Sequence, residues 1–120
     1  MPIEMRDQNG GKVFDVKLIG RLQKEDYRPL VIEFSRLAKA HGKLRVLLDM
    51  TRFEGWDAGA LWQEIKFDAK HLNEMERLAV IGDTRWQQAI ASFAKPFTPA
   101  EVRYFDAGEA EQAAAWVNGG

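Results

Sequence analysis

The chain has 120 residues, of which 46% are hydrophobic and 29% are charged, so we expect one folded domain covering residues 1–120. Lys and Arg number 17 against 18 Asp and Glu, and no basic cluster stands out, so the sequence does not favour nucleic-acid binding. The absence of cysteine excludes disulfides, thiolate metal sites and a cysteine nucleophile.

The amino-terminal residues, MPIEMRDQNGG, are polar and lack the apolar core of a signal peptide. No segment approaches the ~20 consecutive apolar residues that a membrane-spanning helix needs. The sequence therefore favours a cytoplasmic protein that is not integral to a membrane.

A β-hairpin is predicted at the beginning of the chain. A short strand over residues 3–7 is followed by Asn9-Gly10-Gly11, a hairpin signal because Asn and Gly accept positive φ. Along residues 13–19 apolar and charged side chains alternate (Phe14, Val16 and Leu18 against Asp15 and Lys17). This alternation predicts a half-solvated, antiparallel edge strand.

After Gly20 the spacing becomes helical, with apolar residues at positions that share one face (Leu30, Phe34, Leu37 and Ala38). Asp26 can cap this helix, and Pro29 suits its first turn, where the amides have no intrahelical partner to lose. Gly42 is expected to end the helix.

Residues 44–50, LRVLLDM, are nearly continuously apolar, which is typical of a parallel strand buried on both faces. A loop over residues 51–57 is then expected, followed by a helix from about 58 to 73. The apolar stripe of that helix is formed by Leu61, Ile65, Ala69 and Leu72.

The rest of the chain repeats the alternation of strand and helix. Residues 78–81 predict a second buried strand, and Thr84 with Gln87 has capping-box spacing at the start of a helix that Pro96 closes. Residues 102–105 predict a third parallel strand. Asp106 and Glu109 then give a further capping signal before a last helix, whose apolar face carries Ala110, Ala113, Ala114 and Val117.

The expected order is ββαβαβαβα, which requires right-handed crossovers with helices packed on a sheet. We therefore expect a single α/β domain whose mixed sheet has about five strands and is covered by about four helices.

Four stretches resemble the SpoIIAA-like branch of the STAS (anti-sigma-factor antagonist-like) superfamily. They are GRLQKEDY at 20–27, LLDMTRFEGWDAGALW at 47–62, VIGDTRW at 80–86 and KPFTPAEVRYF at 95–105. The chain is most similar to a bacterial SpoIIAA-like family that also carries the label STAS/SEC14. The resemblance implies the SpoIIAA-like fold for nearly the whole chain.

The well-understood members of the superfamily are protein-binding switches, in which a kinase phosphorylates a serine in a D-S-S-G pattern at the start of a helix. The matching residues here are Asp57-Ala58-Gly59-Ala60, which keep the acid and lack both hydroxyls. The nearest hydroxyl, on Thr51, does not lie at the matching place. The phosphoswitch is therefore not expected in this chain.

The candidate site lies where ligands of open α/β sheets gather, outside the carboxyl ends of the strands. Asp57 is expected to be an N-cap, and Gly59 allows close approach to the backbone. Trp56 is either a lid over the core or a contact surface, whereas core packing is the leading interpretation of Trp86. The cations beside the predicted helix starts suit an anion. The candidate residues are Thr51, Arg52, Trp56, Asp57, Gly59, Trp62 and Lys66, with Lys24, Asp83, Arg85 and Trp86 in neighbouring loops.

Trp62 and Phe67 widen the apolar face of the helix expected over 58–73, beside Lys66. Three interpretations stay open: a helix buried on two sides, a contact with a second subunit in a homodimer, or a wall of a hydrophobic pocket.

The motifs of familiar enzymes are missing. No nucleophile elbow, phosphate-binding loop or dinucleotide fingerprint is present, and His41 and His71 lack a matched set of metal ligands. We expect no enzyme activity, no cofactor and no metal.

Two functions are compatible with these observations. The first is a non-catalytic SpoIIAA-like interaction or regulatory module that binds an unknown protein partner. The alternative is a binder or sensor of a small, lipid-like apolar ligand, suggested by four Trp and seven Phe in the chain.

Overall fold

The computed structural model describes residues 3–56, 74–83 and 100–119, without the side chains of Lys24, Tyr27 and Trp56. The strands are β1 (Ile3–Gln8), β2 (Val13–Leu22), β3 (Leu44–Trp56), β4 (Met75–Gly82) and β5 (Glu101–Asp106). The helices are α1 (Lys24–His41) and α5 (Ala110–Val117), with 3₁₀ turns η1 (Asn9–Gly11) and η3 (Ala107–Glu109).

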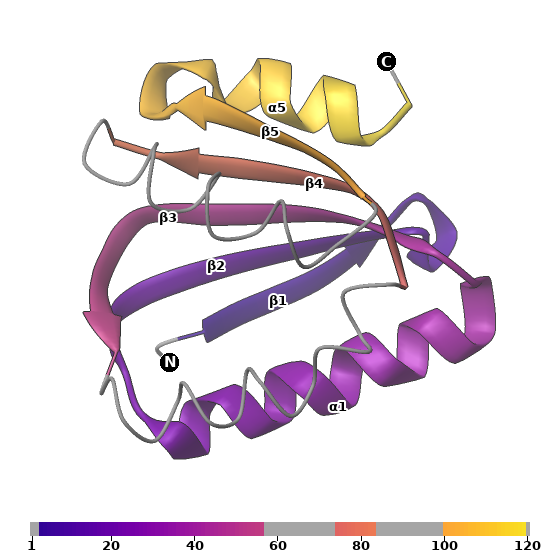
Figure 1. Ribbon diagram of the computed structural model, residues 1–120, viewed down its shortest axis with the longest axis horizontal. Helices are drawn as coiled ribbons and strands as arrows, with labels where there is room; N and C mark the ends of the chain where they lie inside the picture. The colour runs from indigo at the N-terminus through magenta and orange to yellow at the C-terminus, as the bar shows by residue number, and fades with distance from the viewer. Residues whose placement is uncertain (1–2, 57–73, 84–99, 120) are drawn as a thin grey trace.

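The five strands form one mixed sheet, as expected, and their order in the sheet is β1-β2-β3-β4-β5. β1 pairs antiparallel with β2, and every other neighbouring pair is parallel. Helix α1 covers one face of the sheet and α5 the other (Figure 1). Each face has its own core: Leu37 and Ala38 of α1 belong to one cluster of buried side chains, and Ala113 and Val117 of α5 belong to the other.

About four helices were expected, and two α-helices lie in the described part of the chain. The other two expected helices, over residues 58–73 and from Thr84 to Pro96, fall outside the described residues. Neither described helix is long and apolar enough to cross a membrane.

The expected hairpin at the beginning of the chain is confirmed. Asn9, Gly10 and Gly11 have φ values of 56°, 69° and 97°, in the left-handed region that Asn and Gly tolerate best. They form the 3₁₀ turn η1 between β1 and β2, and Ile3 to Gln8 pair with Leu18 to Val13. The chirality of the backbone thus selects these turn residues.

The prediction that residues 13–19 form an edge strand is wrong. β2 lies inside the sheet, between β1 and β3, and it continues to Leu22. Its alternation has a different cause. The α1 face of β2 is buried, whereas on the other face α5 packs on β3, β4 and β5 and leaves Asp15 and Lys17 partly exposed.

Helix α1 begins earlier than the sequence predicted. It begins at Lys24 after an N-cap at Gln23, and Asp26 closes a capping box in which its Oδ2 accepts from the Gln23 amide at 2.9 Å. Pro29 consequently lies inside the helix and not in its first turn. Gly42, at φ +77°, ends the helix as expected.

The last strand and helix agree with the prediction. β5 pairs with β4 in parallel, and the Asp106 amide donates to Glu109 Oε1 at 2.9 Å in the expected capping box. Ala113 and Val117 of α5 are fully buried against the sheet. The apolar spacing therefore identified the packing face at Ala113, Ala114 and Val117, whereas Ala110, also predicted on that face, is exposed.

Candidate functional site

The expected loop over residues 51–57 is wrong for residues 51–56, which continue strand β3 to Trp56. β3 pairs with β4 only as far as Asp49 opposite Ile81. Beyond that point it pairs with the end of β2, up to Trp56 opposite Leu22. We call this two-stranded extension, residues 19–22 paired with residues 52–56, the arm. Figure 1 shows β3 curving away from β4 toward the start of α1.

Two irregularities in the pairing of β2 with β3 bend the arm. The register shifts between Lys17 and Ile19 and again between Gly20 and Arg21. Gly20 has a φ of +70°, which a residue with a side chain adopts only with strain. Such bulges increase twist locally, and each of these shifts places an extra residue on β3, the second one directly beside Gly20.

A polar turn marks the point where β3 leaves β4. Asp49 Oδ1 accepts from the Thr51 amide at 2.9 Å and from the Thr51 hydroxyl at 2.7 Å. This side chain provides an acceptor for a backbone amide at the register shift. The Asp49 carboxylate and the Thr51 hydroxyl therefore fix the base of the arm.

The end of β4 is held by a second bond. The Tyr104 hydroxyl of β5 donates to the Asp83 carbonyl oxygen at 2.5 Å. Burial, followed by the neighbouring Asp106 carboxylate, raises the pKa of Tyr104, so the hydroxyl keeps its proton at neutral pH. The backbone at Asp83, where the chain leaves β4, is thereby tied to β5.

The arm has one buried and one polar side. Phe53 and Leu22 are both 3% exposed and belong to the core beneath α1. Thr51, Arg52 and Glu54 are exposed. Buried anchors on one side and exposed polar groups of both signs on the other suit a surface held rigidly for contact.

The structure brings together only part of the candidate set. Thr51 and Arg52 are neighbours on β3, and the backbone of Trp56 ends that strand. Lys24 begins α1 two residues after the arm, and Asp83 follows the last residue of β4. The other candidates lie outside the described residues: Asp57, Gly59, Trp62, Lys66, Arg85 and Trp86.

At the opposite end of the sheet, arginines hold the carboxyl end of α5. Arg77 Nη1 donates to the Trp116 carbonyl oxygen at 2.7 Å, and its guanidinium lies 5.2 Å from the centre of the Trp116 ring. Arg45 Nη1 donates to the Val117 carbonyl oxygen at 3.3 Å, and Arg103 lies 5.6 Å from the same ring. The last carbonyls of a helix lack intrahelical partners and favour nearby cations.

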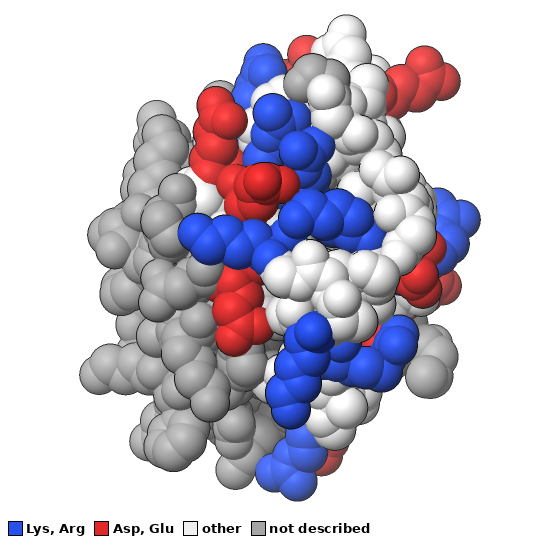
Figure 2. Space-filling model, turned by 90° about the vertical axis from the view of Figure 1, so that its right-hand side faces the viewer, with Lys and Arg blue, Asp and Glu red and all other residues white. Residues whose placement is uncertain are grey.

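Figure 2 looks onto this amino end of the parallel strands and shows Lys and Arg side chains spread across it, with acidic side chains between them. Glu76 accepts from Arg45 Nε at 2.7 Å and lies 3.8 Å from Lys12 Nζ. The bond from Arg45 lowers the pKa of Glu76 from its usual 4.5. Cations and anions at this end therefore stabilise one another and α5.

Three residues that shape the site were not among the predicted site residues. They are Asp49, Gly20 and Tyr104. Asp49 and Thr51 have the two-residue spacing of an Asx turn, which was a readable signal. Gly20 signalled a possible bulge within a longer β2. The bond from Tyr104 to Asp83 joins segments 21 residues apart and had no local signal.

The family model described as SpoIIAA-like matches residues 13–118 of this chain. No curated protein matches this chain.

Two solved structures share the fold. The chain is similar to an uncharacterised protein of the DUF3478 family with a SpoIIAA-like fold from Shewanella loihica PV-4, with 28% identity, a TM-score of 0.77 and coverage of 96% of this chain and 93% of the other. It is also similar to the anti-sigma factor antagonist SpoIIAA in its unphosphorylated form, with 14% identity, a TM-score of 0.65 and coverage of 98% of both chains. At that identity, the second likeness concerns the fold alone.

Proposed function

The chain belongs to the SpoIIAA-like family, and from this premise we propose that it is a non-catalytic interaction module that binds a partner protein through the arm. The exposed side of the arm, with Thr51, Arg52 and Glu54 above the buried Phe53, is the observation that carries the proposal. Trp56, at the end of the arm, is the proposed aromatic anchor, and buried aromatic residues dominate the binding energy of many protein interfaces.

The support beneath this surface favours binding. Within the arm, residues 52–56 of β3 pair with residues 19–22 of β2, and Phe53 and Leu22 fix the arm to the core under α1. A surface that is ordered before binding loses little conformational entropy on binding. Its charges of both signs match the polar rim of ordinary protein interfaces, and a nucleic-acid interface would instead need clustered cations.

Two hydroxyls, one at the base of the arm and one beside the end of β4, have structural partners. The Thr51 hydroxyl donates to Asp49, and the Tyr104 hydroxyl donates to the Asp83 carbonyl oxygen. Both groups are thus engaged in holding the strand ends. These bonds indicate that the two hydroxyls have a structural role, which is to fix the surface, and not a catalytic one.

Recognition by this module does not need phosphorylation. The position at which related switches carry a serine is occupied here by Ala58, within Asp57-Ala58-Gly59-Ala60. The proposed partner therefore binds side chains that are not phosphorylated. Intact-mass analysis of protein purified from its native cells tests this point, because a phosphate group on residues 49–62 that changes partner binding contradicts it.

Affinity capture from native lysate tests the interaction itself. The immobilised wild-type chain should recover a specific protein, and both Arg52→Ala and Trp56→Ala should reduce that recovery. Glu111→Ala, on the exposed side of α5, is the matched control and should leave recovery unchanged. Recovery that is equal for the wild type and both arm variants contradicts the proposal.

A further inference from the structure

Strand β1 is an edge of the sheet. In the part of the chain that the structure describes, β1 pairs with β2 on one side and with no strand on the other. An edge strand presents backbone amide and carbonyl groups that can accept a further strand. β1 pairs with residues 13–18 of β2 and not with residues 19–22 of the arm, so this edge is a surface distinct from the proposed site.

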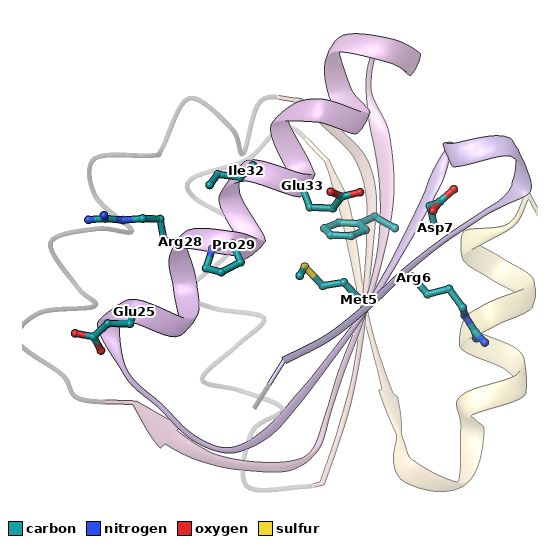
Figure 3. Close-up of a pocket in the computed structure, with 9 residues that line it drawn as sticks. Met5, Arg6, Asp7, Glu25, Arg28, Pro29, Ile32 and Glu33 are labelled. Atoms are coloured by element: carbon teal, nitrogen blue, oxygen red, sulfur yellow. The ribbon is translucent and has the colours of Figure 1, made fainter. Parts of the chain in front are cut away.

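A groove of about 540 Å³ runs between β1 and α1. It contains two unusually exposed apolar side chains, Met5 at 37% and Ile32 at 63%. Figure 3 shows Met5 of β1 and Pro29 and Ile32 of α1 along the groove, while Arg6 points away from it. The α1 face of the strand edge thus has apolar side chains that the described residues leave exposed, with charged groups such as Asp7 and Glu33 beside them.

The opposite face of β1 carries charge in an ordered pattern. Glu4 lies opposite Lys17 of β2, and Arg6 lies opposite Asp15, to which it donates at 3.1 Å. The Arg6 side chain remains 72% exposed. Its guanidinium has further donors, so it can bind a second carboxylate beyond β1.

We propose that β1 of a second copy of this chain pairs antiparallel with β1. The two-fold axis passes between the two Met5 residues, which lie directly opposite each other. This arrangement places Glu4 of each copy opposite Arg6 of the other. Two attractive pairs then continue the charge pattern of β2 and β1 across the interface. On the other face the two Met5 side chains meet beside Ile32.

Charge selects this register. Residues directly opposite in an antiparallel pair share a face, so the axis of a continuous two-fold sheet passes through a residue of β1. Moving the axis by one residue to Glu4 places Glu4 opposite itself, and moving it to Arg6 places Arg6 opposite itself. Of these three arrangements, only the axis at Met5 avoids placing like charges opposite each other. It forms two attractive pairs between Glu4 of one copy and Arg6 of the other.

The other edge of the sheet is less suited to the same pairing. Arg103 of β5 lies 5.2 Å from the Phe105 ring and 5.6 Å from the Trp116 ring. Its guanidinium is thus stacked within its own chain, whereas Arg6 extends into solvent. The charges favour self-association at β1.

Sedimentation velocity on the full chain, from micromolar to millimolar concentration, tests the proposal, because a pair of six-residue strands is expected to form an interface of the weak class below about 1,200 Å². The wild type should show a reversible monomer–dimer equilibrium. Glu4→Arg and Arg6→Glu should each weaken it by about tenfold or more, equivalent to about 1.4 kcal/mol. An equimolar mixture of these two variants should restore dimers, since both charge pairs across the interface are then attractive.

Two further variants complete the experiment. The double variant Glu4→Arg/Arg6→Glu should dimerise like the wild type, and Glu111→Arg on α5 should leave dimerisation unchanged. Thermal unfolding of each variant shows that it is folded. A wild type that stays monomeric at millimolar concentration overturns the proposal, as does a dimer unaffected by the single swaps or a mixture that fails to associate.

Discussion

At the amino ends of the parallel strands, Arg77 donates to the Trp116 carbonyl oxygen and Arg103 lies over the Trp116 ring. At the carboxyl ends, Arg52 and Glu54 lie exposed on the arm. The same residue type thus has two uses in one sheet. Where a cation meets the carbonyls of a helix end, it stabilises the fold. Where it lies exposed on a rigid strand, it is available for recognition.

The largest expected effect comes from exchanging equivalent arginines at the two ends. Arg77→Met should lower the free energy of unfolding by about 2 to 3 kcal/mol, because it removes a charge-assisted hydrogen bond and a cation–π contact. Arg52→Met should change it by less than about 0.5 kcal/mol, as is usual for exposed positions. Urea unfolding followed by circular dichroism measures both values, and equal losses would break the comparison.

The bend of the arm gives the next effect. Gly20→Ala should cost about 1 to 2 kcal/mol, because alanine at the +70° φ of Gly20 is strained. Gly108→Ala in η3 is the matched control, since a Cβ at Gly108 meets no atom within 4 Å. Thermal unfolding at one pH compares them. An unchanged melting temperature for Gly20→Ala would show that the arm tolerates another direction.

The polar turn at the base of the arm has a smaller effect. Asp49→Ala should cost about 1 kcal/mol, because the Thr51 amide and hydroxyl lose their acceptor. Asp49→Asn keeps an acceptor oxygen and should cost less. If urea unfolding gives the same loss for both variants, the negative charge of Asp49 matters and the geometry of the turn does not.

Lowering the pH should reduce the stability contributed by the ion pair at the amino ends of the parallel strands only slightly. Since the bond from Arg45 lowers the pKa of Glu76 below 4.5, the stability that this pair contributes is present above that pH and is lost as pH falls through the lowered value. The side chain of Glu76 is 43% exposed, so the contribution is under about 1 kcal/mol. The stability difference between the wild type and Glu76→Gln should therefore shrink below about pH 4, in urea titrations repeated across pH. A difference that stays constant would exclude ionisation as its cause.

Much of the fold was predictable because its signals are local. The turn at Asn9 and Gly10, the buried strands and the Asp106–Glu109 capping box all depend on neighbouring residues, and the structure has each of them. The failures concern pairing between distant segments. Residues 51–56 look like a loop because polar residues and Gly55 interrupt the apolar run, yet they form a strand through pairing with the end of β2.

The same reason limits the candidate site. Thr51 and Arg52 were chosen from their position after a buried strand, and both are exposed on β3. The arm that carries them depends on the backbone at Gly20 and on register shifts, which no local spacing specifies. The prediction that β2 is an edge strand was wrong for a similar reason. The alternation of apolar and charged side chains along β2 arises because α5 packs on β3, β4 and β5.

The most direct test is the affinity of the captured partner for two variants, one from each end, measured by titration calorimetry at a temperature where both are folded. The double variant Thr51→Ala/Arg52→Ala alters the arm, and Arg103→Ala alters the amino end. We predict that the arm variant binds about tenfold more weakly or worse, while Arg103→Ala binds like the wild type. An arm variant with wild-type affinity, or an equal loss in both variants, would contradict the assignment of recognition to the arm.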